Sequence, residues 1–385
     1  MRTRAGAAAA VALATAALVG LGAGACGGRK DHGPVEPPGD PDPGREANVR
    51  AILLRELEIE VLEGYDQPTF ETAAPATAVS GRVGAVHIGV GPDDIAAGGV
   101  TSVDRWPLLP VDEIGGRLDE AESKRLQLHL SEDLSAAWIA DEISYRVPGC
   151  LGRDGRYKVA VVPLRYTGLF VRDGERWVEV LEHVSYPQRI GELVDDAEGM
   201  IGKKLRIGRD PRPAVQQPLD VVKRAISADL PESERARLYA SDPGALAMWP
   251  DPEQELHGSA VLSAASLARS FDASKISLET FRVGMSPDPD GGVGPGTVAW
   301  VAATLRVDAR RVEGTKMEPV TLRLRGTFVL EDRDQPDGTR AWQIVQAHVS
   351  APVDDEALVG TVRGSEASTE ATLPWQRPCE GQWTR

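Results

Sequence analysis

Residues 177–187 read WVEVLEHVSYP, and residues 342–352 read WQIVQAHVSAP. The two stretches lie 165 positions apart, and Trp, Val, His, Val, Ser and Pro coincide in them. Identities of this density at one constant offset indicate that the chain carries an internal repeat.

Further matches extend the repeat towards the N-terminus. Residues 165–171 match 323–329 at an offset of 158, which predicts seven extra residues in a turn at 331–341 of the second copy. The sequence AWIA at 137–140 recurs as AWVA at 299–302, and residues 84–86 match 244–246. Because the matches keep their order in both halves, the chain of 385 residues is predicted to hold two copies of one domain.

Each copy opens with an apolar stripe at helical spacing, and strand-like runs follow it. The stripes are Val49, Ile52, Leu53, Leu57 and Val61 in the first copy, and Leu219, Val222, Ile226 and Leu230 in the second. The expected strands are 84–88, 124–131, 136–147, 157–172 and 176–186, then 244–248, 275–285, 297–310, 319–331 and 340–351. Gly168 and Gly326 fall inside long strands, where glycine often marks a bulge or bend. The pattern predicts an α+β fold in which a bent antiparallel sheet wraps round a helix.

An Ala-Trp strand followed by Trp-x5-His-x-Ser-x-Pro resembles the SnoaL-like branch of the nuclear-transport-factor-two-like, ketosteroid-isomerase-like superfamily. The residues that carry the resemblance are Trp138, Trp177, His183, Ser185 and Pro187, and in the second copy Trp300, Trp342, His348, Ser350 and Pro352. The resemblance implies two tandem cone-shaped domains, each with an apolar pocket. Members of the superfamily include isomerases, polyketide cyclases, dehydratases and non-catalytic binding modules, and a shared fold does not choose among them.

The expected organisation has six parts. They are a signal peptide at 1–25, a Pro/Gly-rich tether at 26–45, a first SnoaL-like domain at 46–190, a linker at 191–212, a second SnoaL-like domain at 213–355 and a tail at 356–385. Family members often dimerise through their sheets. The resemblance therefore implies a monomer whose two domains pack as an internal pseudo-dimer.

His183 and His348 are the sharpest candidates for chemistry. On a strand each shares a face with the Trp and Ser of its motif, so the ring could point into a pocket and act as a general base or hydrogen-bond a ligand. The other interpretation is a histidine whose ring nitrogens are satisfied within the sheet. Both interpretations stay open at this point.

Asp141 and Tyr145 are weaker candidates for an acid–base pair. They lie four apart on one strand and so share a face, which suits either a pocket pair or a solvated face of the sheet. The aligned residues of the second copy are Ala303 and Val307, so that copy lacks both groups.

Four tryptophans, Trp138, Trp177, Trp300 and Trp342, could line a ligand pocket or belong to the core. No metal site and no cofactor are predicted. Asp332 to Gly338 departs from a calcium loop in its donor spacing, and the segment is expected to be a solvated hairpin turn.

The N-terminus predicts export and lipid anchoring. Arg2 and Arg4 precede an uncharged stretch at 5–25, as in a signal peptide, and the small residues before Cys26 resemble a lipobox. Simple secretion is the alternative, because Ala23 stands where Leu is usual. The Pro-rich tether favours acylated Cys26, and Gly27 after it implies sorting to the outer membrane.

Charge and cysteine content support an exported protein. Loss of the two signal-peptide arginines changes the net charge from −15 to −17, and so acidic a chain is not expected to bind nucleic acid. Cys150 and Cys379 are the remaining cysteines, and the oxidising compartment predicts a disulfide between them.

The leading functional hypothesis is a membrane-tethered, non-catalytic binding or scaffold lipoprotein of the cell envelope. It rests on a duplicated domain without a duplicated acid–base pair, and its partner would be an apolar small molecule or an envelope protein. The alternative is an isomerase-, cyclase- or dehydratase-type enzyme that uses His183 or Asp141 on an apolar small molecule in the first domain.

Overall fold

A computed structural model describes residues 46–51, 53, 84–92, 95–97, 120–123, 126–151, 157–173, 176–195, 213–242, 245–287, 295–313 and 315–353. The predicted signal peptide, the tether, Cys26 and Cys379 lie outside these residues, so the anchor and the disulfide stay predictions. In this described part of the chain, no helix is both long and apolar enough to span a membrane.

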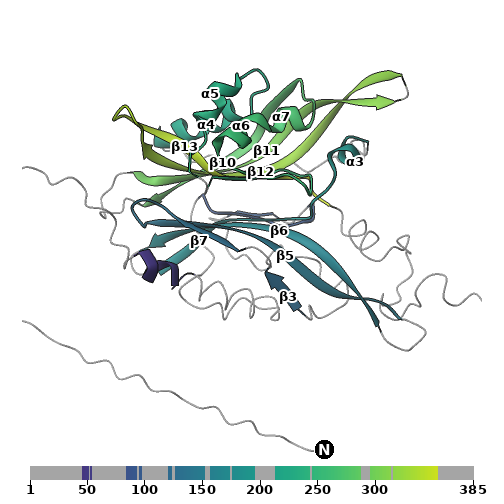
Figure 1. Cartoon of the computed structure of the whole chain (residues 1–385), viewed down its shortest axis with the longest axis horizontal. Coiled ribbons are helices and arrows are strands. Elements are labelled where there is room, and N and C mark those ends of the chain that lie inside the picture. The colour runs from purple at the N-terminus through teal and green to yellow at the C-terminus, as the bar shows by residue number, and fades with distance from the viewer. Residues whose placement is uncertain are drawn as a thin grey trace, which may run out of the picture. The chain divides into compact units, whose positions relative to one another are not determined.

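The first sheet contains seven strands, and its long strands β5, β6 and β7 lie side by side (Figure 1). Its order is β2-β1-β7-β6-β5-β3, and β4 also pairs with β5. The strands are β1 (Val86–Ile88), β2 (Ile95–Ala97), β3 (Glu120–Ser123), β4 (Gln127–Leu130), β5 (Ala136–Leu151), β6 (Tyr157–Asp173) and β7 (Arg176–Ser185).

The second sheet has six strands in the order β10-β11-β12-β13-β8-β9 (Figure 1). The strands are β8 (Leu246–Met248), β9 (Glu255–His257), β10 (Lys275–Pro287), β11 (Pro295–Glu313), β12 (Lys316–Asp334) and β13 (Arg340–Ser350). The ten predicted strands all appear, and β2, β3 and β9 are additions that their short, weakly patterned sequences did not reveal.

The two sheets share one connectivity. In each, the long strands are antiparallel, and the last of them also pairs in parallel with a short strand from earlier in the chain: β7 with β1, and β13 with β8. His183 stands opposite Ile88, and His348 stands opposite Met248, so the repeated motif has the same register in both sheets. The mixed α+β class with curved sheets is confirmed, although each sheet contains this one parallel pair.

Strand register corrects the predicted alignment of the repeats. Arg165 pairs with Ser185, and Arg325 pairs with Ser350. Arg325, not Arg323, is therefore the counterpart of Arg165, at an offset of 160 rather than 158. Both sheets have a bulge between the last two long strands, and the predicted match of residues 165–171 with 323–329 is two residues out of register.

The hairpin after β12 is also shorter than predicted. The strands continue to Asp334 and resume at Arg340, so the turn spans 335–339 instead of 331–341. Gly338 takes a φ of +78°, which glycine adopts without strain, and the ion pair of Arg340 with Asp332 joins the strand ends. The segment is the hairpin turn that the sequence predicted.

The second sheet is covered by helices on one side (Figure 1). They are α4 (Gln216–Ala225), α5 (Glu232–Ala236), α6 (Ser259–Ala264) and α7 (Leu267–Ser270), with η2 (Pro213–Val215) before them and α3 (Ile190–Asp195) after the first sheet. Leu219 and Val222 of α4 are buried, as the helical stripe predicted. In the first copy the described helical residues are 46–51 and 53, and Leu53 is completely buried.

Trp300 lies at the centre of the second sheet. Its indole Nε1 donates a hydrogen bond of 2.7 Å to the carbonyl of Gly84, and its ring covers Gly284 on the neighbouring strand. A Cβ at position 284 would lie 2.1 Å from Cζ2 of the ring. Trp300 is therefore a packing residue, and its ring fits because Gly284 has no side chain.

Candidate functional site

His183 lies between the two sheets rather than at a pocket mouth. Its ring is completely buried and stacks on the ring of His348, with centroids 3.8 Å apart and planes 21° from parallel. Nδ1 lies 3.0 Å from the hydroxyl of Thr327, and Nε2 lies 2.8 Å from the hydroxyl of Ser350. Both partners of the ring belong to the second sheet.

His348 makes the reciprocal contacts to the first sheet. Its Nδ1 lies 2.9 Å from Thr167, and its Nε2 lies 2.7 Å from Ser185. Each motif histidine is thus hydrogen-bonded by the motif serine of the other repeat. This exchange is what an approximate twofold relation between two copies of one surface produces.

Two arginines repeat the same exchange. Arg165 of β6 donates to three backbone carbonyls in the loop after β8: those of Trp249, Asp251 and Pro252, at 2.6, 3.0 and 2.8 Å. Arg325 of β12 donates to the carbonyls of Gly89 and Gly91, after β1, at 3.0 and 2.6 Å. Both arginines are buried. The loop after the short parallel strand of each sheet is therefore held by an arginine from the other sheet.

Burial lowers the pKa of both histidines. The pKa of His348 falls to about 3, through desolvation and then the nearby charge of Arg165. The pKa of His183 falls well below its usual value through desolvation, with further contributions from His348 and Arg325. Two neutral rings whose nitrogens are all hydrogen-bonded fit a structural role at the contact between the two sheets, which we call the junction. This agrees with the interpretation that the ring nitrogens of each histidine are satisfied within the protein.

The tryptophans follow the core interpretation. Trp138 and Trp300 are each 2% exposed and belong to the main hydrophobic cluster, and Trp342 is partly buried against it. Trp177 is 6% exposed at the start of β7. None of the four is brought together with the groups described next.

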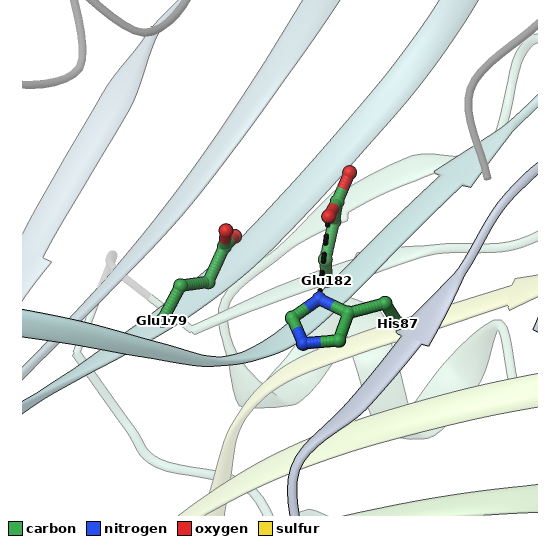
Figure 2. Close-up of side chains that lie close together, drawn as sticks. All are labelled: His87, Glu179 and Glu182. Atoms are coloured by element: carbon green, nitrogen blue, oxygen red, sulfur yellow. Dashed lines mark hydrogen bonds and ion pairs between the residues drawn. The ribbon is translucent and has the colours of Figure 1, made fainter. Parts of the chain in front are cut away.

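The opposite face of the first sheet carries a polar cluster. Glu182 precedes His183 on β7, so its side chain points away from the second sheet. The parallel pairing of β1 with β7 places His87 beside Glu182. A bulge between Leu169 and Phe170 brings Glu179 onto the same face (Figure 2).

The cluster is compact and almost fully buried. His87 Nδ1 lies 3.3 Å from Glu182 Oε2, and one ligand-type atom from each of His87, Glu179 and Glu182 lies within 4.8 Å of the others (Figure 2). The three residues are 0%, 2% and 1% exposed. Desolvation lowers the pKa of His87 to about 3, so its imidazole is neutral near pH 7.

Tyr166 orients the second carboxylate. Its hydroxyl donates a hydrogen bond of 2.8 Å to Glu179 Oε1. Gly168 leaves the space for this pair, because a Cβ there would lie 2.9 Å from the Tyr166 hydroxyl and 3.0 Å from Glu179 Oε1. The arrangement can hold a polar group of a ligand, move a proton or bind a cation.

Asp141 extends the cluster along the sheet. It stands opposite Tyr166 in the β5–β6 pairing and is 3% exposed, so the solvated-face interpretation is wrong for this residue. Tyr145 lies on the same strand, opposite Val162, but its side chain is outside the described residues. Of the two predicted catalytic residues whose side chains the structure describes, His183 and Asp141, it is Asp141 that lies beside the cluster.

The second sheet has no polar groups at the matching positions. Strand register pairs the two sets as follows: His87 with Ala247, Asp141 with Ala303, Tyr166 with Gly326, Glu179 with Ile344, and Glu182 with Ala347. All five second-sheet residues are buried, and Phe328 fills the place of Gly168. The corresponding face is therefore polar in the first sheet and apolar in the second at these five positions.

Sequence reasoning missed His87, Tyr166, Glu179 and Glu182. His87 is 95 positions from Glu182, and no local spacing connects them. A usable signal was present in the repeat itself, because Glu179 and Glu182 align with Ile344 and Ala347 within the very segments that revealed the duplication.

Comparison with known protein families identifies one domain in the chain. The SnoaL-like domain model matches residues 232–354. This stretch spans α5 to β13, so the second sheet and its helices form a SnoaL-like domain. The fold is a ligand-binding one that occurs in isomerases, dehydratases and non-catalytic proteins.

Solved structures with the same fold are distant. Nuclear transport factor 2 from Cryptosporidium parvum is 16% identical, with 37% of this chain and 99% of that chain covered and a TM-score of 0.24. A nuclear transport factor 2-like protein from Salmonella enterica serovar Typhimurium is 18% identical, with 37% and 93% covered and a TM-score of 0.27. A proposed dehydratase from Streptomyces avermitilis is 16% identical, with 37% and 99% covered and a TM-score of 0.26. No curated protein sequence matches this chain.

Proposed function

We propose that the protein is a small-molecule-binding lipoprotein of the cell envelope whose first repeat, at 46–190, is the binding domain. The observation that carries the proposal is the asymmetry between the sheets. Five buried polar residues cover a face on which the second sheet places Ala, Gly and Ile. Buried polar groups cost folding free energy, so their confinement to one repeat points to a binding role there.

The second repeat would then serve as a structural partner. Its matching face is filled by apolar side chains, and its other face supplies the ring stack and the arginine contacts to the first sheet. The ligand expected in the first repeat has an apolar skeleton and at least one polar group, because Glu179 and Glu182 lie on a face that also carries Ile139 and Phe170.

A variant that copies the second sheet tests this proposal. His87→Ala, Glu179→Ile and Glu182→Ala together give the first sheet residues that the second sheet already carries. Native mass spectrometry of the protein isolated from its own membrane is expected to show a bound small molecule in the wild type and none in the triple variant. Unfolding by urea is expected to show a triple variant at least as stable as the wild type, because buried polar groups are replaced by packed apolar ones.

The control is His257→Ala, which removes an exposed histidine paired with Glu255 at 3.0 Å. This variant should keep the ligand. A triple variant that retains the same bound mass, or a wild type that carries none, would contradict a binding role for the first repeat.

An acid–base enzyme is the second candidate. The hydrogen bond between His87 and Glu182 favours it, because an imidazole beside a carboxylate is a common arrangement for proton transfer. In this form the reaction would use His87 rather than His183, which lies in the junction. A ligand recovered unchanged after incubation with the wild type would decide for binding.

We also propose that Cys26 anchors the chain to the outer membrane through an acyl group. The support is the signal-like stretch at 5–25 and the Pro-rich tether. Cys26→Ser is expected to abolish acylation, measured by intact-protein mass, and to move the protein from the membrane fraction to the soluble fraction. If the variant stays acylated and membrane-bound, the anchor is elsewhere.

A further inference from the structure

We propose that His87, Glu179 and Glu182 bind one divalent cation, with zinc as the best-fitting ion. This inference deepens the proposed function, because the cation would occupy the polar cluster of the first repeat and present an open position to the ligand. One imidazole nitrogen and two carboxylate oxygens form a donor set that suits zinc among the available metals.

The distances in the cluster agree with a shared ion. Zinc bonds to nitrogen and oxygen are about 2.1 Å long, so neighbouring ligand atoms of a tetrahedral ion stand about 3.4 Å apart. The separation of His87 Nδ1 from Glu182 Oε2 is 3.3 Å. One ligand atom of Glu179 lies within 4.8 Å of one from each of the other two residues, so all three can face one ion.

Electrostatics favours a cation at this point. Glu179 and Glu182 are both buried, and two ionised carboxylates this close repel each other strongly in an interior of low dielectric constant. An ion of charge +2 between them turns the repulsion into attraction. The imidazole of His87, whose Nδ1 lies 3.3 Å from Glu182 Oε2, adds a nitrogen ligand.

A supporting shell is present as well. The hydroxyl of Tyr166 donates a hydrogen bond of 2.8 Å to Glu179 Oε1, which orients this carboxylate within the cluster. Gly168 makes room for this contact. The second sheet has Gly326 and Phe328 at these two positions, so it lacks the supporting shell together with the ligands.

The experiment uses the full chain, stripped with a chelator and titrated with zinc chloride. Calorimetry and elemental analysis of the dialysed protein are expected to give one zinc per chain for the wild type. Glu182→Gln and His87→Gln should weaken zinc binding at least about 100-fold, and Tyr166→Phe should weaken it about tenfold through the supporting shell. Circular dichroism checks that each variant is folded.

His257→Gln is the matched control, because it removes a histidine that also lies 3.0 Å from a glutamate but is exposed. It should bind zinc as the wild type does. A wild type without bound zinc would overturn the proposal and would mean that the two carboxylates share a proton instead. Unchanged zinc affinity in the Glu182→Gln and His87→Gln variants would overturn it as well. If zinc is absent while the small molecule is still bound, the metal site is refuted and the binding function stands.

Discussion

Replacing Arg165 with methionine is expected to lower the free energy of unfolding by about 4 kcal/mol. Arg165 is 3% exposed, and its guanidinium donates to three backbone carbonyls of the loop at 249–252. Hydrogen bonds from a charged donor contribute about 1.5–3 kcal/mol each, and methionine leaves the carbonyls without that donor. Since methionine keeps most of the side-chain volume, the loss reports the polar contacts rather than a cavity.

Arg325→Met should behave in the same way with a somewhat smaller loss, because Arg325 donates to two carbonyls, those of Gly89 and Gly91. Urea unfolding of each variant gives the two values. Arg323→Met is the control: this arginine is partly exposed and pairs with Glu279 at 2.9 Å, so its removal should cost less than about 1 kcal/mol. Equal losses for Arg165→Met and Arg323→Met would show that the loop contacts do not stabilise the junction.

The strands could be predicted from sequence because their cause is local. Alternation of polar and apolar residues marks a strand wherever it occurs, and the repeat supplied each pattern twice. The predicted run 176–186 and the observed β7 at Arg176–Ser185 differ by one residue at one end. The short strands β2 and β9 form mainly because β1 and β8 offer them an edge, which no local pattern reveals.

The site could not be predicted in the same way. Alternation predicted correctly that His183 shares a face with Ser185, but it does not say what covers that face. In the structure the cover is the second sheet, which supplies Thr327 and Ser350 to the ring. A histidine that looks like a catalytic base in one repeat becomes a junction residue when two repeats pack together.

The polar cluster of His87, Glu179 and Glu182 is a candidate site that the sequence patterns did not indicate. Glu182 lies beside His87 because β1 pairs with β7 in parallel, and this pairing joins residues 95 positions apart. A comparison of the two repeats position by position could have found the cluster without the structure. Functional groups stand out where one copy of a duplicated fold departs from the other, since the shared positions are those that packing requires.

Acid is expected to destabilise the protein through the stacked rings of His183 and His348. Their pKa values in the folded state lie below the ordinary 6.5, at about 3 for His348 and well lowered for His183. Above pH 6.5 the rings are neutral in the folded and the unfolded chain, so the stability is fully present. As the pH falls below 6.5 the unfolded chain takes up protons that the folded chain refuses, and stability is lost down to the folded pKa.

The loss amounts to about 1.4 kcal/mol per pH unit for each ring, hence about 4 kcal/mol for the two rings between pH 6.5 and 5. The double variant His183→Gln, His348→Gln has no proton to take up at these positions. It should be less stable than the wild type at pH 7.5, since the ring stack is gone, but its stability should fall less between pH 7.5 and 5. Urea unfolding at the two pH values measures both quantities.

The comparison isolates the junction because every other titrating group is common to both proteins. His87, whose pKa also falls to about 3, contributes the same loss to the wild type and to the double variant and cancels in the difference. Parallel losses in wild type and double variant would mean that the rings accept protons inside the folded junction, and the neutral stack would have to be abandoned as its explanation.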